Sequence, residues 1–200
     1  MKTLSFAIIA FLSIILVSCN GEKKEGKAYD KQVNEEISKE TNEEKEEIQN
    51  VKTLAISLSP KSDSKVSGNI TFTEDSGVVT MVAYLNGLAE GEHAIHIHEK
   101  ADCSPDDGKS TGGHWNPTME PHGKWGAIEG YHKGDIGNFN ATADGKGAIT
   151  FATNEWCIGC GDDKKDIVGK AIIVHQGIDD FKSQPSGAAG SRVSCGGIIK

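Results

Sequence analysis

Apolar and polar residues alternate in the stretch Glu92-His93-Ala94-Ile95-His96-Ile97-His98-Glu99. Alternation with a period of two is typical of a β-strand whose two faces have different surroundings. On such a strand Ile95 and Ile97 share the face that packs inward, while His96 and His98 share the opposite face. The stretch therefore predicts a strand that places two imidazoles where they can converge on one metal ion.

Similar short runs follow one another from residue 51 onward. Their regularly spaced residues are Leu54, Ile56 and Leu58, then Val66, Ile70 and Phe72, and then Val78, Thr80, Val82 and Tyr84, which share one face. Clusters of turn-forming residues separate the runs, as at 59–63 and 74–77. Further strands are expected at 92–98, 136–142, 147–153, 169–175 and 191–198. These runs predict an all-β fold of about eight antiparallel strands with no long helix inside the domain.

Glycine is the most over-represented residue, with 24 in 200 positions, of which only Gly21 and Gly26 precede residue 51. So many glycines favour tight turns over helices. We therefore predict an eight-stranded Greek-key β-barrel or sandwich for residues 51–200. Two stretches, 99–134 and 176–190, resist strand assignment, and loops of that length in a compact domain are usually functional.

The N-terminal segment indicates export. Lys2 precedes an apolar run over residues 4–17, which is shorter than the roughly 20 residues of a membrane-spanning helix. We therefore predict that residues 1–18 are a signal peptide. The run ends in Leu16-Val17-Ser18-Cys19, which resembles the bacterial lipobox and implies cleavage before Cys19 and lipidation of that cysteine. An ordinary signal peptide with an incidental cysteine is the alternative.

Charged residues dominate the segment that follows Cys19. Residues 20–50 contain ten acidic residues, six lysines and one aromatic residue, Tyr29. Such a segment buries too little apolar surface to fold, so residues 19–50 are expected to be a lipidated cysteine and a solvated tether. A transient amphipathic helix marked by Val33, Ile37 and Ile48 is the alternative. The formal net charge of −8 argues against a nucleic-acid partner.

All seven histidines lie between residues 93 and 175. The first long loop supplies His114, His122 and His132 together with Asp135, and a later predicted strand ends at His175. Copper and zinc favour imidazole ligands, and zinc also accepts a carboxylate. Six histidines and an aspartate exceed the ligands of one tetrahedral site, so the sequence indicates two adjacent metal ions.

Five stretches resemble the copper/zinc superoxide dismutase family, in the family's order and through nearly all of residues 51–200. They are His96-Ile97-His98-Glu99, Gly112-Gly113-His114-Trp115-Asn116-Pro117, Gly134-Asp135-Ile136-Gly137-Asn138, Val174-His175 and Gly190-Ser191-Arg192-Val193-Ser194-Cys195-Gly196. The resemblance implies copper and zinc as cofactors. It implies copper ligation by His96, His98, His114 and His175, and zinc ligation by His114, His122, His132 and Asp135. His114 would then bridge both ions as an imidazolate.

The resemblance also implies the reaction, which is dismutation of superoxide to oxygen and hydrogen peroxide. His114 would exchange a proton with the reacting oxygen species. Arg192, the only arginine, would hydrogen-bond the anion beside the copper. Asp179 would orient ligand histidines of both metals. His93 would be structural, and Lys182 would either attract the anion or merely be solvated.

The five cysteines divide into three groups. Cys19 is assigned to lipid. The family resemblance implies a disulfide between Cys103 and Cys195, which suits an oxidising compartment. Cys157 and Cys160 lie outside the family's general pattern; we predict a second, local disulfide, with a thiol redox pair or an extra metal site as alternatives.

Two other classes of protein compete with the enzyme. A copper carrier or inactive scaffold of the same fold would be expected to lack a copper ligand or the arginine, and a purely structural β-sandwich would make the matched positions coincidences. We therefore predict an oxidoreductase in the bacterial cell envelope, anchored by lipid in the periplasm or at the cell surface. The sequence leaves open whether it is a monomer or a homodimer.

Overall fold

The computed structural model describes residues 51–200. The predicted signal peptide, the lipidation of Cys19 and the tether to residue 50 lie outside the described residues and stay predictions. Within residues 51–200, no helix has the length and apolar character needed to cross a membrane.

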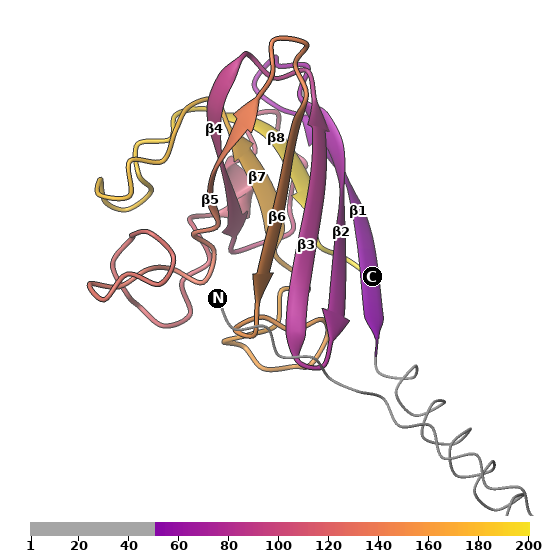
Figure 1. Ribbon diagram of the computed structural model, residues 1–200, viewed down its shortest axis with the longest axis vertical. Helices are drawn as coiled ribbons and strands as arrows, with labels where there is room; N and C mark the ends of the chain where they lie inside the picture. The colour runs from indigo at the N-terminus through magenta and orange to yellow at the C-terminus, as the bar shows by residue number, and fades with distance from the viewer. Residues whose placement is uncertain (1–50) are drawn as a thin grey trace, which may run out of the picture. The chain divides into compact units, whose positions relative to one another are not determined.

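Eight antiparallel strands form a closed barrel (Figure 1). They are β1 (Lys52–Pro60), β2 (Ser67–Asp75), β3 (Val78–Asn86), β4 (Gly91–His98), β5 (Gly137–Ala141), β6 (Gly147–Thr153), β7 (Ala171–His175) and β8 (Arg192–Gly197). Their order around the barrel is β1-β2-β3-β6-β5-β4-β7-β8. In the described part of the chain, the helical structure is one short 3-10 turn, Lys109–Thr111. The all-β prediction is confirmed, and the barrel, not an open sandwich, is the form adopted.

The barrel core is filled by one face of each strand. On β1 the predicted residues Ile56 and Leu58 are buried. On β3 the predicted residues Val78, Thr80, Val82 and Tyr84 do share a face, but it is the outer face of the barrel. The residues of β3 that line the core are Val79, Met81, Ala83 and Leu85. Both faces of β3 carry apolar residues, so alternation alone could not tell the inside from the outside.

Strand β4 is buried on both of its faces. Ile95 and Ile97 belong to the barrel core, as predicted, while His96 and His98 on the opposite face are only 0% and 1% exposed. The outer face of a barrel strand is buried only where other chain segments cover it. The two long loops lie on the side of the barrel that carries β4 and β5 (Figure 1).

Backbone hydrogen bonds attach the first long loop to the end of β4. The amide of Trp115 donates to the carbonyl of Ile97 at 2.8 Å, and the amide of Ile97 donates to the carbonyl of Gly134 at 2.9 Å. A Cβ at Gly134 would overlap the Ile97 carbonyl, so this close approach requires glycine. Loop residues on both sides of the histidine-rich segment are thereby fixed against one strand.

A disulfide between Cys103 and Cys195 ties the same loop to β8, as the family resemblance implied. The two cysteines are 92 positions apart, and Cys195 is buried beside Ala171 and Ile173. Closing a loop of this size stabilises the folded state by about 4 to 5 kcal/mol in the chain-entropy account.

Candidate metal centre

Four imidazoles come together at the outer face of β4 and β7. Each of His96, His98, His114 and His175 offers one ring nitrogen, and the four atoms lie within 4.8 Å of one another. His96 and His98 come from β4, while His175 ends the neighbouring β7. At this point the β7–β8 ladder has a register shift: Val174 pairs with Ser194 and His175 with Arg192, so the extra residue, Val193, lies on β8.

One nitrogen of each ring is held and the other is left without a partner. The Nδ1 atom of His98 donates to the carbonyl of Gly112 at 3.0 Å, and that of His175 lies 3.4 Å from the carbonyl of Gly190. The opposite nitrogen of each ring is buried without a hydrogen-bond partner. These atoms are Nε2 of His98, His114 and His175 and Nδ1 of His96. Four buried lone pairs that face each other are a preformed site for a cation, since buried polar atoms are otherwise paired.

A second group shares one member with the first. His114, His122, His132 and Asp135 also offer ligand atoms within 4.8 Å of one another. The Nδ1 atoms of His114, His122 and His132 lie 2.8, 3.0 and 3.2 Å from the carboxylate of Asp135. Three imidazoles and one buried carboxylate match the ligand types and number of a tetrahedral zinc site.

Asp179 contacts one histidine of each group, on the ring nitrogen that faces away from the group. Its Oδ2 accepts a hydrogen bond from Nε2 of His96 at 2.9 Å, and its Oδ1 accepts one from Nε2 of His122 at 2.8 Å. These bonds leave the Nδ1 atoms of both rings free to face their respective groups. The predicted orienting residue therefore contacts one histidine of each group.

Burial and charge set the protonation of these groups. Burial lowers the pKa of His98 and His175 well below the ordinary imidazole value, and neighbouring imidazoles lower both further. Burial also lowers the pKa of His114 to about 4. Burial disfavours the His122 cation, but hydrogen bonds to Asp135 and Asp179 raise its pKa to about 9. His98, His114 and His175 of the first group are thus kept neutral, while the second group is built around a carboxylate.

Arg192 lies beside the first group at the start of β8. Its guanidinium donates to the carbonyl of Gly108 at 2.8 Å, the hydroxyl of Thr111 at 2.9 Å and the carbonyl of Gly112 at 2.8 Å. Three of its five N–H donors are used to fix it, so two remain for another partner. Arg192, His98, His114 and His175 line the same cavity of about 370 Å³. A small anion in this cavity would meet the imidazoles and the Arg192 guanidinium together.

The other predicted residues fall outside these two groups. His93 lies with its ring nitrogens 3.0 and 2.9 Å from the carbonyls of His175 and Ala89, which suits a structural role. Lys182 is exposed. Cys157 and Cys160 form the predicted local disulfide. Although Asp166 and these sulfurs lie within 4.8 Å of one another, both sulfurs are already bonded to each other.

Several residues that hold the site were missed in the sequence. Asn138 exchanges hydrogen bonds of 2.8 and 2.9 Å with the backbone of Asp179, and Gln184 does the same with His122 at 2.9 Å. Gly187 passes so close that a Cβ there would overlap the Asp179 carboxylate. Asn138 belongs to one of the stretches that resemble the family, so its role could have been predicted from the sequence. Gln184 and Gly187 lie in an irregular loop with no local signal.

A second support contacts the residues on both sides of His132. The carboxylate of Glu155 accepts hydrogen bonds from the Tyr131 hydroxyl at 2.7 Å and from the Lys133 ammonium. The indole N–H of Trp156 donates to the carbonyl of Lys133 at 2.8 Å, and Trp156 is only 1% exposed. Glu155 and Trp156 thus hold the His132 segment against the end of β6, although neither is a ligand.

An antiparallel barrel with two ligand groups that share one imidazole defines a class of binuclear metalloproteins. Comparison with known proteins identifies the family. The model of the copper/zinc superoxide dismutase family matches residues 66–198, and the chain belongs to this family. It is accordingly an oxidoreductase of the superoxide dismutase type, with copper and zinc as cofactors.

Individual relatives agree with the family match. The chain is 35% identical to a Cu-Zn superoxide dismutase of Aquifex aeolicus, over 76% of this chain and 89% of the relative. It is 39% identical to one from Caulobacter vibrioides, over 69% and 80%, and 35% identical to an extracellular one from Drosophila melanogaster, over 74% and 84%. The crystal structure of a double mutant of a SOD-like protein from Bacillus subtilis matches with a TM-score of 0.64 and 31% identity, over 73% of this chain and 97% of that chain.

We expect Trp156→Phe to weaken metal retention by the second group. The change keeps an aromatic ring in the core but removes the N–H that holds the Lys133 carbonyl, at a cost of about 1 to 3 kcal/mol for an unpaired buried acceptor. Zinc release to a chelator should accelerate, while copper release should change little. Phe151→Leu, which disturbs the ring packed against Trp156 without touching this bond, is the control. Equal zinc release in both variants would contradict the assignment.

Proposed function

We propose that this protein dismutates superoxide at a copper/zinc site bridged by His114. In this proposal His96, His98, His114 and His175 hold copper, and His114, His122, His132 and Asp135 hold zinc. The observation that carries the proposal is the position of His114. Its Nε2 is unpartnered in the first group, and its Nδ1 lies 2.8 Å from Asp135 in the second.

The ligand types support this division of the metals. The first group is all imidazole, which suits copper, whereas the second adds a carboxylate, which zinc accepts. The cavity beside Arg192 is lined by His98 and His175 of the first group, by the shared His114 and by His132 of the second group. A small anion there would meet more members of the first group than of the second, together with a guanidinium. When bound, copper supplies the one-electron redox change that dismutation requires, and zinc keeps a single oxidation state.

Arg192 binds and orients the anion. Its three bonds to Gly108, Thr111 and Gly112 fix the guanidinium, and the remaining donors face the anion. Because the Debye length is about 8 Å at physiological salt, the charged residues that line the cavity, Arg192 and Glu99, act on an approaching anion more strongly than the net charge of the whole chain does.

His114 supplies the proton. The ring holds a proton at Nε2 in one half of the cycle and donates it to the forming peroxide in the other. Its Nδ1 stays directed at the second group, so the ring keeps its orientation throughout. Asp179 fixes His96 and His122 on either side, which keeps the site in shape as the proton moves.

A copper carrier or inactive scaffold of the same fold is the competing function. Such a protein would be expected to lack a copper ligand or the guanidinium beside the site. Here the four imidazoles of the first group converge and Arg192 lines the cavity that leads to them. This combination favours the enzyme.

We further propose that the protein works in the bacterial cell envelope. Residues 1–18 would be removed as a signal peptide, Cys19 would carry lipid, residues 19–50 would act as a tether, and residues 51–200 would be the catalytic domain. Two of the relatives are bacterial, and a third is named as extracellular. Two disulfides also suit an oxidising compartment. The protein would act there as a monomer or a homodimer.

The function is tested by loading the full-length protein with copper and zinc. We expect one ion of each metal per chain. We also expect rapid consumption of superoxide, which pulse radiolysis would measure. The electronic spectrum of a His114→Ala variant should lose the features of the coupled site. Full metal content without superoxide consumption would instead identify a carrier.

Arg192→Ala should lower the rate of superoxide consumption by about tenfold or more, because it removes a fixed cation from the path of the anion. The salt dependence of the rate should flatten, and both metals should stay bound. Arg192→Lys keeps the charge and should retain part of the salt dependence. Loss of copper from the alanine variant would show that Arg192 serves the structure of the site and not the anion.

Cys19→Ser should release the protein from the membrane. Lipid on Cys19 is the proposed anchor, since about 0.8 kcal/mol is gained for each buried methylene. Metabolic labelling with an alkyne fatty acid should mark the wild-type chain and leave the variant unlabelled. Membrane fractionation should then recover the variant in the soluble fraction. A labelled variant, or an unlabelled wild type, would refute the proposed anchor.

A further inference from the structure

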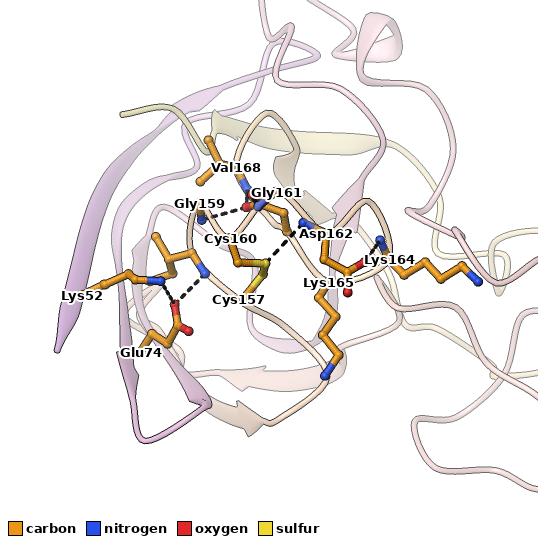
Figure 2. Close-up of a disulfide and its surroundings, with 12 residues drawn as sticks. Lys52, Glu74, Cys157, Gly159, Cys160, Gly161, Asp162, Lys164, Lys165 and Val168 are labelled. Atoms are coloured by element: carbon orange, nitrogen blue, oxygen red, sulfur yellow. Dashed lines mark hydrogen bonds and ion pairs between the residues drawn. A yellow bond between two sulfur atoms is a disulfide. The ribbon is translucent and has the colours of Figure 1, made fainter. Parts of the chain in front are cut away.

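The proposed dismutation makes no use of the disulfide between Cys157 and Cys160, which lies in the loop from β6 to β7 (Figure 2). This pair spans only three positions, whereas Cys103 and Cys195 are 92 positions apart. A bond that closes so small a loop restricts the unfolded chain far less than one that closes a large loop. The local pair therefore contributes less to folding than the other disulfide does.

One sulfur-bearing residue of the pair is open to solvent. Cys160 is exposed, while Cys157 is 5% exposed. Glycines flank Cys160 on both sides, and a Cβ at Gly161 would meet no atom within 4 Å. At Gly159, by contrast, a Cβ would overlap the side chain of Lys200. A thiol from another molecule can therefore approach Cys160 from the Gly161 side, but it meets Cys157 only beneath the surface.

The loop is held in shape by bonds other than the disulfide (Figure 2). The carboxylate of Asp166 accepts the amides of Gly159, Gly161 and Val168 at 2.9, 2.9 and 3.0 Å. The amide of Cys157 donates to the carbonyl of Lys165 at 2.8 Å, and the carbonyl of Cys157 accepts the amide of Ile167 at 3.1 Å.

The same loop is also fixed to the barrel. The amide of Ile158 donates to Oε2 of Glu74 on β2 at 2.8 Å, and Glu74 pairs with Lys52 on β1 at 3.2 Å. Ile158 and Ile167 are 3% and 0% exposed. With the sulfur–sulfur bond open, these contacts keep both cysteines next to each other, so the bond can form again in place.

A backbone donor faces the exposed sulfur. The amide of Asp162 donates to Sγ of Cys160 at 3.5 Å (Figure 2). In the reduced pair this N–H would be a donor available to the Cys160 sulfur, while the carboxylate of Asp166 lies within 4.8 Å of both sulfurs. Thiol–disulfide exchange depends on access to the sulfur that is attacked, so the exposed Cys160 is the sulfur at which the bond would both open and close.

We propose that Cys157 and Cys160 form a thiol–disulfide exchange site whose substrate is a dithiol, such as the paired cysteines of a protein reductant. A thiolate of the dithiol attacks Sγ of Cys160; the bond to Cys157 breaks, and Cys157 leaves as a thiolate and takes up a proton. The second thiol of the partner then attacks the mixed disulfide and releases Cys160. Two electrons pass to the pair, and the partner becomes a disulfide; the reverse reaction restores the starting state.

The first test compares the two disulfides of the metal-loaded full-length protein, with dithiothreitol as the dithiol. Samples are quenched in acid, free thiols are alkylated, and each pair is quantified by peptide mass spectrometry. Cys157–Cys160 should open at least about tenfold faster than Cys103–Cys195, because its sulfur is accessible. Oxidised dithiothreitol should then close it again. An equal or reversed order, or failure of the local pair to open or to close, would overturn the proposal.

Two matched variants test which sulfur reacts. Cys157→Ser leaves the thiol of Cys160, and Cys160→Ser leaves the thiol of Cys157. With oxidised glutathione as the probe, the Cys160 thiol should form a mixed disulfide about tenfold faster than the Cys157 thiol. Equal rates, or a faster Cys157, would refute the assigned site of attack.

The double variant Cys157→Ser/Cys160→Ser separates exchange from a structural role. It should keep its metal content, its rate of superoxide consumption and a melting temperature within a few degrees of the wild type. Loss of the fold would show that the bond is structural and would overturn the proposal. Because superoxide consumption is measured in the same samples, failure of the exchange site is distinguishable from failure of the proposed dismutation.

Discussion

The carboxylate of Asp179 accepts one ring N–H from each of the two ligand groups, and this contact constrains the rest of the centre. It holds Nε2 of His96 and Nε2 of His122, which leaves the opposite nitrogen of each ring to face a cation. Without it, the buried rings of His96 and His122 would be free to flip and to pair with neighbouring imidazoles. Asn138 and Gly187 in turn give Asp179 its place, the first by hydrogen bonds and the second by leaving room.

The barrel supplies the rigid part of this arrangement. Two adjacent strands, β4 and β7, fix three of the imidazoles, and their inner faces are anchored in the core. The loop ligands have no secondary structure of their own. They are positioned by bonds to the end of β4, by the Cys103–Cys195 disulfide and by Glu155 and Trp156, which directly follow the end of β6. Ligands on rigid strands are held by the barrel itself, whereas ligands on loops need several hydrogen bonds or a disulfide to hold them in place.

The two disulfides differ in the same physical terms. Cys103–Cys195 closes a long loop and has one half buried in the barrel wall, so it serves the fold and the position of the loop beside Arg192. Cys157–Cys160 closes almost no loop, exposes one half and sits in a turn that Asp166 already organises. Cys103–Cys195 thus has the features of a structural disulfide, and Cys157–Cys160 has those of the proposed exchange site.

Much of the architecture followed from the sequence, because period-two alternation and glycine-rich turns are local properties. The eight strands and the shared face of His96 and His98 were predicted on that basis, and the family resemblance indicated the loop ligands. The orientation of β3 could not be predicted, since both of its faces are apolar. Nor could the roles of Trp156, Gln184 and Gly187, because their partners are far away in the chain. Local pattern determined which segments are strands and which residue types could bind metal; only tertiary contacts decided which nitrogen of each ring is held, since that depends on donors and acceptors that meet through folding.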